Sequence, residues 1–319
     1  MNKTETFTEE VMKSLVAGTL VLILGAAAVP ARAELKVATS LTDLASVAQF
    51  VGGNHVSAQS LCRGYEDPHF VPAKPSLMKA IQRADVFVST GLELDGGWLP
   101  VVLPGSRNPK IQPGQRGFVD ASEGVNVLEK PSGTVTRAEG DVHPLGNPHY
   151  YLDPKNLEIV ADHLAEVFSN IDPANAADYA ANAKAFNQRM ETSLAGWEKQ
   201  MEPYQGASFV AYHKNFIYFA DRFGLKIFGY VEPKPGIPPS PRHIADLADA
   251  MKASGVTLVT YQPYYDAGAC NELAARVGGV AVEVPSEVDG VPETKDVFAK
   301  FDFLVSSFAG AMSKKGASQ

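Results

Sequence analysis

Short apolar runs alternate with amphipathic stretches along most of this chain. The first run predicts a strand at 35–39, the stretch after it a helix from Asp43 to about Val51, and residues 56–62 a second strand. The second half repeats this order, with a strand at 207–212, a helix at 215–223 and a strand at 226–231. Strand, helix and strand at this spacing predict right-handed parallel crossovers, so both halves are expected to be α/β.

The remaining apolar runs extend the same alternation. Helices are predicted at 75–83, from 154, from 241, at 269–277 and at 298–312, and strands at 85–90, 118–119, 256–261 and 280–284. Residues 129–147 carry no apolar period and are punctuated by proline and glycine, which predicts a long loop.

The longest helical pattern runs from Pro173 to about Gln200, between the two α/β runs. Its apolar residues recur at three- and four-residue steps, namely Tyr179, Ala183, Phe186, Met190, Leu194 and Trp197. An ordinary amphipathic helix packed on a core explains this pattern, and its position also suits a rigid spacer. We therefore predict two Rossmann-like α/β lobes, 34–172 and 202–319, joined by a linking helix at 173–201.

Composition places the chain among soluble globular proteins. Its 319 residues are 45% hydrophobic and 20% charged, which is enough length and apolar content for two cores. The formal net charge of −8 argues against a general nucleic-acid binder, because such proteins need a concentrated basic face.

The amino terminus has the pattern of an export signal. Lys3 and Lys13 precede an apolar run from Leu15 to Val29, and Ala31-Arg32-Ala33 follows as a small-x-small cleavage site. The run is about 15 residues, short of the ~20 that a membrane anchor needs. We predict a signal peptide at 1–33, cleavage after Ala33, a periplasmic mature chain and no membrane insertion of that chain.

Three histidines stand just past apolar runs or loops and are the candidate chemistry. They are His69 in Asp67-Pro68-His69, His149 in Asn147-Pro148-His149, and His213 after Tyr212. They are far apart in sequence (149 − 69 = 80; 213 − 149 = 64), so only the fold can bring them together. Neutral imidazole is the commonest zinc ligand, and three such nitrogens with a water or carboxylate complete a tetrahedron. The alternative is three unrelated surface or capping histidines.

Other polar and sulfur-bearing residues leave several questions open. Asp141 and His143 lie in the long loop, which serves either as a first contact or lid for a metal, or as a passive surface loop. His243, in the first turn of a predicted helix, is interpreted as a surface residue. Cys62 and Cys270 either form a disulfide or remain free, partly buried thiols.

The order of these phrases resembles the periplasmic zinc- and manganese-binding receptors of ABC importers, the ZnuA-like solute-binding proteins. The resemblance covers essentially all of the predicted mature chain. Its markers are Glu66-Asp67-Pro68-His69 with Pro72 and Pro75-Ser76, Ala84-Asp85 with Gly91-Leu92-Glu93, 147–154, Tyr212-His213 with Phe216, and Pro235-Gly236-Ile237 with Pro239. It implies two α/β lobes around a long spanning helix, with the metal in the cleft between the lobes and His69, His149 and His213 as ligands.

The resemblance leaves the fourth ligand open. Many family members have an aspartate after the last strand, in the region that is 282–290 here, and this chain replaces it near Pro285. Glu287 is our first candidate, with Asp289 or water as alternatives, and Glu66 or Asp67 as further possibilities. A histidine at 213, where manganese-type relatives typically have a carboxylate, favours Zn²⁺ over Mn²⁺.

The resemblance predicts a monomeric zinc receptor that delivers Zn²⁺ to the permease of an ABC importer. One alternative is a periplasmic carrier that delivers zinc to other proteins. Another is a secreted hydrolase with a His₃ zinc site, but the chain has neither a His-Glu-x-x-His phrase nor a nucleophile elbow. We therefore do not expect an enzyme.

Overall fold

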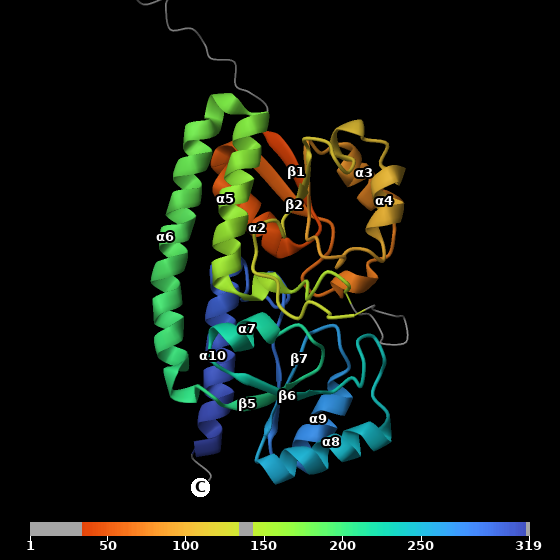
Figure 1. Ribbon diagram of the computed structural model, residues 1–319, viewed down its shortest axis with the longest axis vertical. Coiled ribbons are helices and arrows are strands. Elements are labelled where there is room, and N and C mark those ends of the chain that lie inside the picture. The colour runs from red at the N-terminus through yellow and green to blue at the C-terminus, as the bar shows by residue number, and fades with distance from the viewer. Residues whose placement is uncertain (1–33, 134–142, 317–319) are drawn as a thin grey trace, which may run out of the picture. The chain divides into compact units, whose positions relative to one another are not determined.

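The computed structural model describes residues 34–133 and 143–316, within one compact unit that extends from Glu34 to Gln319 (Figure 1). The predicted signal peptide, its cleavage after Ala33, and Asp141 lie outside the described residues.

The first sheet has four parallel strands in the order β2-β1-β3-β4. Its strands are β1 (Leu35–Thr39), β2 (Val56–Ser60), β3 (Val86–Ser89) and β4 (Phe118–Asp120). Every residue of β3 is buried, as expected of a central parallel strand covered on both faces. Helices α2 (Thr42–Gly52), α3 (Pro75–Gln82) and α4 (Leu99–Gly105) belong to the same lobe.

The second sheet repeats this topology with the order β6-β5-β7-β8, again all parallel. It is made of β5 (Ser208–Ala211), β6 (Lys226–Tyr230), β7 (Leu258–Tyr261) and β8 (Val280–Glu283), with helices α7 (Ile217–Arg222), α8 (Pro241–Ser254) and α9 (Ala267–Arg276). The prediction of two parallel α/β lobes is therefore confirmed.

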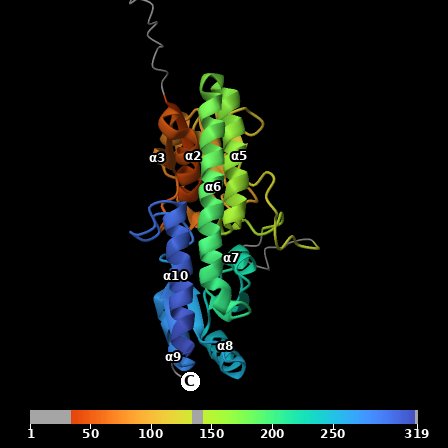
Figure 2. The same cartoon turned by 90° about the vertical axis from the view of Figure 1, so that its left-hand side faces the viewer.

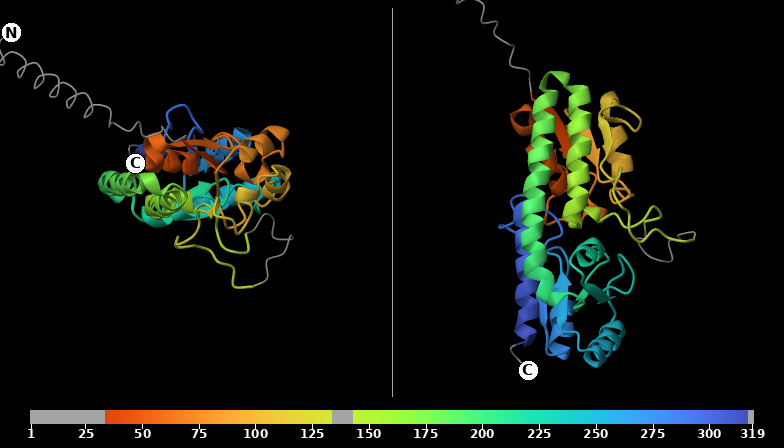
Figure 3. Two further views of the ribbon diagram at one scale, coloured as in Figure 1. Left: turned by 90° about the horizontal axis from the view of Figure 1, so that it is seen from above. Right: turned by 60° about the vertical axis from the view of Figure 1, so that its left-hand side comes forward.

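Three long helices pack beside the sheets, and two of them, α6 and α10, link the two lobes. Helix α5 (Pro154–Ile171) and helix α6 (Ala176–Met201) are connected by a 3-10 turn at Pro173–Asn175. The two helices pack side by side (Figure 3, right). Helix α6 also packs against α2 of the first lobe and against the closing helix α10 (Val297–Gly316), as Figure 2 shows. The predicted linking helix is thus present, one 3-10 turn shorter at its start. The exact lobe boundaries stay a prediction.

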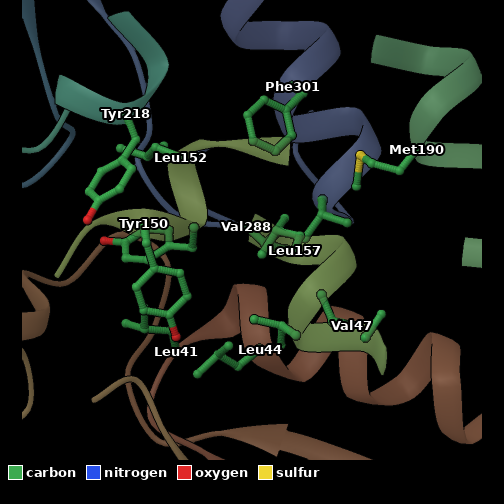
Figure 4. Close-up of a cluster of buried hydrophobic side chains, with 14 of the residues drawn as sticks. Leu41, Leu44, Val47, Tyr150, Leu152, Leu157, Met190, Tyr218, Val288 and Phe301 are labelled. Carbon is green, nitrogen blue, oxygen red and sulfur yellow. The ribbon is translucent and has the colours of Figure 1, made fainter. Parts of the chain in front are cut away.

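One hydrophobic cluster runs through both lobes. It contains Val37 of β1 and Phe209 of β5, and between them residues of α2, α6 and α10. Figure 4 shows Leu44 of α2, Met190 of α6 and Phe301 of α10 around the segment that carries Tyr150 and Leu152. The segment that follows His149 is therefore set in the shared core.

A buried ion pair lies in the same region. Asp43 of α2 and Lys300 of α10 are both fully buried, and the Lys300 Nζ donates to Asp43 Oδ1. The ammonium also donates to the carbonyls of Tyr151 at 3.2 Å and Ser286 at 3.3 Å. Asp43 Oδ2 accepts from the Val288 amide at 2.9 Å. These four bonds hold together segments that are distant in sequence.

The two cysteines are separate free thiols. Both Cys62 and Cys270 are buried, and neither forms a disulfide. Burial raises the pKa of the Cys270 thiol to about 12 and that of Cys62 further still, so neither is a ready thiolate at neutral pH. The open choice between a disulfide and free thiols is resolved in favour of free thiols.

Candidate metal centre

His69 is oriented by Asp67, which lies two positions before it in the sequence. The histidine lies in the 3-10 turn Pro68–Phe70, beyond the carboxyl end of β2. Asp67 Oδ1 accepts from the His69 backbone N–H at 3.0 Å and from the ring Nδ1 at 2.8 Å. The Trp98 indole donates to the Pro68 carbonyl at 2.9 Å, which fixes the turn from the other side. The Nδ1 atom of His69 is therefore engaged by Asp67, and its Nε2 atom remains for another partner.

The same arrangement recurs at His149. Asn147 Oδ1 accepts from the His149 backbone N–H and from its ring Nδ1, both at 3.0 Å. The side-chain Nδ2 of Asn147 donates in turn to the Lys214 carbonyl at 2.7 Å. Tyr218 of α7, which Figure 4 shows beside Tyr150, donates to the Asn147 carbonyl at 2.7 Å. The loop carrying His149 is thus bonded to the second lobe.

A buried carboxylate orients the third histidine. His213 follows β5 by two residues, and its Nδ1 donates to Glu232 Oε1 in a short hydrogen bond. The other oxygen of Glu232 accepts from the Gly236 amide at 3.1 Å. Both side chains are about 5% exposed or less.

The three rings converge. One ligand nitrogen from each of His69, His149 and His213 lies within 4.8 Å of the other two. Their ring centroids are 5.1 Å (His69–His213), 5.3 Å (His69–His149) and 5.3 Å (His149–His213) apart. Because each Nδ1 donates to an oxygen acceptor, the Nε2 lone pairs remain for a metal, and the buried Nε2 of His69 has no protein partner. Metal-binding histidines are held by oxygen acceptors in this way.

Burial sets the protonation state of His149. The pKa of His149 lies well below its usual value, first because the ring is buried and then because His69 and His213 add repulsive charge. The ring is therefore neutral at neutral pH, which is the form that binds metal. Burial alone would raise the pKa of Asp67, but the hydrogen bonds and charge of His69 outweigh burial and lower it. Asp67 thus stays an acceptor for His69.

Glu287 lies outside this group. Its Oε1 accepts from the Tyr151 hydroxyl at 2.9 Å and its Oε2 from the Ser286 hydroxyl at 2.8 Å. Burial raises its pKa to about 8, so it is mostly uncharged at neutral pH. Asp289, the alternative, is 52% exposed and pairs with Lys295 at 3.3 Å. Glu287 is therefore bonded to other residues in this structure, and its role as fourth ligand stays a prediction.

His143 lies beside the centre. It lines a cavity of about 200 Å³ together with His149 and His213, and its ring centroid is 5.4 Å from that of His69. His243 is elsewhere: it is half-buried instead of exposed, and its Nε2 lies 3.0 Å from the Tyr230 carbonyl of β6. The interpretation of His243 as a surface residue is thus corrected, while its place outside the group agrees with the sequence.

We predict that Asp67→Ala lowers zinc affinity by about 10–100-fold, the usual effect of losing a partner that orients a ligating histidine. The removed carboxylate fixes both the rotamer and the tautomer of His69. Titration calorimetry measures the change. Asp178→Ala is the matched control, because Asp178 accepts from His55 at 2.8 Å at an exposed site. Equal affinities for the two variants would show that Asp67 does not orient a ligand.

The chain is similar in sequence to known proteins of one family. A family model described as "ZnuA: Zinc-uptake complex component A periplasmic" matches residues 37–302. The high-affinity zinc uptake system protein ZnuA of Brucella abortus (strain 2308) is 30% identical over 118 residues, 37% of this chain. That match spans 35% of the length of the Brucella protein. The ZnuA of Paracoccus denitrificans is 26% identical over 280 residues, 77% of this chain and 82% of that protein.

Solved structures share the fold. A crystal structure of ZnuA superimposes with a TM-score of 0.73 at 21% identity, covering 87% of this chain and 99% of the other. A Mn-bound periplasmic metal binding protein from Candidatus Liberibacter asiaticus gives a TM-score of 0.71 at 17% identity, with 87% and 99% coverage. At these identities the likeness shows the two-lobed architecture.

Proposed function

The chain belongs to the family of zinc-uptake complex component A periplasmic proteins, and from this premise we propose that it is a periplasmic receptor that captures Zn²⁺ for an ABC importer. The observation that carries the proposal is the convergence of His69, His149 and His213, with each Nδ1 held by an oxygen. The outer partners therefore already orient the three rings in the way that metal-binding histidines are oriented.

The donor set favours zinc as the cargo. The converging group consists of imidazoles alone, with no carboxylate within reach of all three among the described residues. Imidazole-rich sites suit Zn²⁺, whereas Mn²⁺ prefers oxygen ligands. We therefore propose Zn²⁺, with Mn²⁺ as the weaker ligand.

We further propose that the protein acts as a monomer after cleavage behind Ala33. In the described part of the chain, no helix combines the length and the apolar character needed to cross a membrane. The receptor would present the loaded cleft to the permease of the importer, and the permease would take up the ion.

We also propose that the bound ion is cargo and that the protein has no enzymatic activity. A zinc hydrolase needs a free carboxylate or comparable base beside the metal. Three carboxylates of this region are engaged, namely Asp67 with His69, Glu232 with His213, and Glu287 with Tyr151 and Ser286.

Metal uptake by cells tests the proposal. We expect a strain lacking this gene to lose uptake of radioactive zinc under zinc limitation. The wild-type gene should restore uptake, and His213→Ala should not. Normal uptake in the deletion strain, together with loss of zinc from other periplasmic proteins, would instead identify a carrier that serves those proteins.

A further inference from the structure

We propose that Tyr218 is a positioning residue that holds His149 and His213 as one pre-arranged pair, to which His69 adds the third nitrogen. The inference rests on the proposed function and concerns how the three rings are placed relative to one another. Tyr218 acts through Asn147, which connects the two histidines.

The side chain of Asn147 makes this connection. Its Oδ1 accepts from the backbone N–H and from the ring Nδ1 of His149. Its Nδ2 donates at 2.7 Å to the carbonyl of Lys214, the residue that follows His213. One amide group therefore orients the first histidine and binds the backbone beside the second.

The two histidine phrases of the chain differ at the residue that makes this link. Asp67 stands two positions before His69, and Asn147 stands two positions before His149. A carboxylate accepts from the backbone and ring of a histidine, as Asp67 does, but an ionised carboxylate has no hydrogen to donate to a carbonyl. The asparagine supplies both functions, and the donor function joins His149 to the second lobe.

Tyr218 fixes Asn147 from the second lobe. Its hydroxyl donates to the Asn147 carbonyl at 2.7 Å and accepts from the Leu128 backbone N–H at 2.9 Å. The Asn147 backbone N–H donates to the Leu128 carbonyl at 2.9 Å. Burial raises the pKa of Tyr218 to about 12, so the hydroxyl keeps its proton and remains a donor at neutral pH. The backbone of Asn147 is therefore held at both its N–H and its carbonyl.

Helix α7 holds the same segment a second time, beyond His149. Arg222 lies four residues after Tyr218 (222 − 218 = 4) and so on the same face of the helix. Its guanidinium donates to both carboxylate oxygens of Asp153, at 2.7 and 2.8 Å. The helix that follows His213 is therefore bonded to the chain on both sides of His149.

The segment of His149 is also attached to the first lobe. The Tyr150 hydroxyl donates to the Thr90 carbonyl, just past β3, at 2.9 Å. Without the Tyr218 bond this attachment would remain, and the hold of the second lobe on His149 would be weaker. The Tyr218 bond therefore sets how closely His149 follows His213.

Titration calorimetry of Tyr218→Phe in three backgrounds of the mature protein tests the pairing. In the wild type we expect zinc affinity to fall by about tenfold, the lower end of the effect of losing an outer partner. In His69→Ala the same substitution should again cost about tenfold, because the pair is still present. In His213→Ala it should cost less than about twofold, because no pair is left to position.

Tyr179→Phe is the matched control. Its buried hydroxyl donates to Asp172 at 2.9 Å, at the opposite end of α5 from Asp153. This variant also loses a buried hydrogen bond, but we expect it to keep the zinc affinity of the wild type. Thermal unfolding of the metal-free proteins compares stability. A loss of affinity in Tyr218→Phe alone, at similar melting temperatures, supports positioning.

The outcomes separate this inference from the proposed function. A wild-type protein that binds no zinc would overturn the proposed function itself. Wild-type affinity in Tyr218→Phe, in a protein that binds zinc tightly, would overturn only the role of Tyr218. Equal losses in the His69→Ala and His213→Ala backgrounds would mean a general effect on the fold and would overturn the pairing.

Discussion

Substitution of His69, His149 or His213 by alanine should in every case lower zinc affinity by more than about 100-fold. This loss exceeds the roughly 10–100-fold expected when a residue that only orients a ligand is removed. Each substitution removes one of three nitrogens that lie within 4.8 Å of one another. It also leaves an acceptor, Asp67, Asn147 or Glu232, without the ring that it orients. Titration calorimetry, with a competing chelator for the wild type, measures the loss.

His243→Ala is the control for this series, because His243 bonds the Tyr230 carbonyl and takes no part in the group. We expect its affinity to equal that of the wild type. A variant among the first three that keeps full affinity would remove its histidine from the site. A loss in His243→Ala would mean that the series reports damage to the fold.

The second large effect concerns stability. Lys300→Ala should lower the free energy of unfolding by about 3–5 kcal/mol, the usual cost of breaking a buried ion pair from one side. Lys300 and Asp43 are both fully buried, so the substitution leaves the Asp43 carboxylate without a cation. It also removes the donor to the Tyr151 and Ser286 carbonyls. Urea denaturation of the metal-free protein measures the change.

Lys295→Ala is the matched control, because Lys295 is 71% exposed and pairs with the exposed Asp289. Pairs of this kind contribute about 0–1 kcal/mol, so we expect little change. Replacing both buried partners, by Lys300→Met with Asp43→Leu, should recover part of the loss, because no charge is then stranded. Equal stabilities for Lys300→Ala and Lys295→Ala would contradict the role assigned to the buried pair.

Local pattern was enough to predict the architecture. The run Val86-Phe87-Val88, which ends in Ser89, became the buried strand β3. The three- and four-residue steps after Pro173 became helix α6. Element ends were less predictable. The strand expected at 56–62 ends at Ser60, because Leu61 and Cys62 turn toward the loop that carries His69.

The candidate site was predictable where a phrase repeats. Asp67-Pro68-His69 and Asn147-Pro148-His149 place an acceptor two residues before each histidine, and both acceptors hold the ring Nδ1. The orienting role of Asn147 was missed, although this repetition signalled it. Glu232 was also missed, because a partner 19 residues from His213 has no local signal.

Glu287, whose role as fourth ligand stays a prediction, shows why sequence alone could not assign the partners of a carboxylate. Its neighbours in sequence are compatible with ligation, but a tyrosine 136 residues away claims one of its oxygens. Whether a buried carboxylate turns to a metal or to another partner depends on such tertiary contacts. The same holds for Asp43, whose partner Lys300 is 257 residues distant.

The central claim is that one zinc ion is held by His69, His149 and His213 in the cleft. Anomalous scattering at the zinc edge from crystals of the zinc-loaded protein tests it directly. We predict one strong peak about 2.0–2.1 Å from the Nε2 atom of each of the three histidines. A peak elsewhere, or no peak near these rings at full zinc occupancy, would contradict the account.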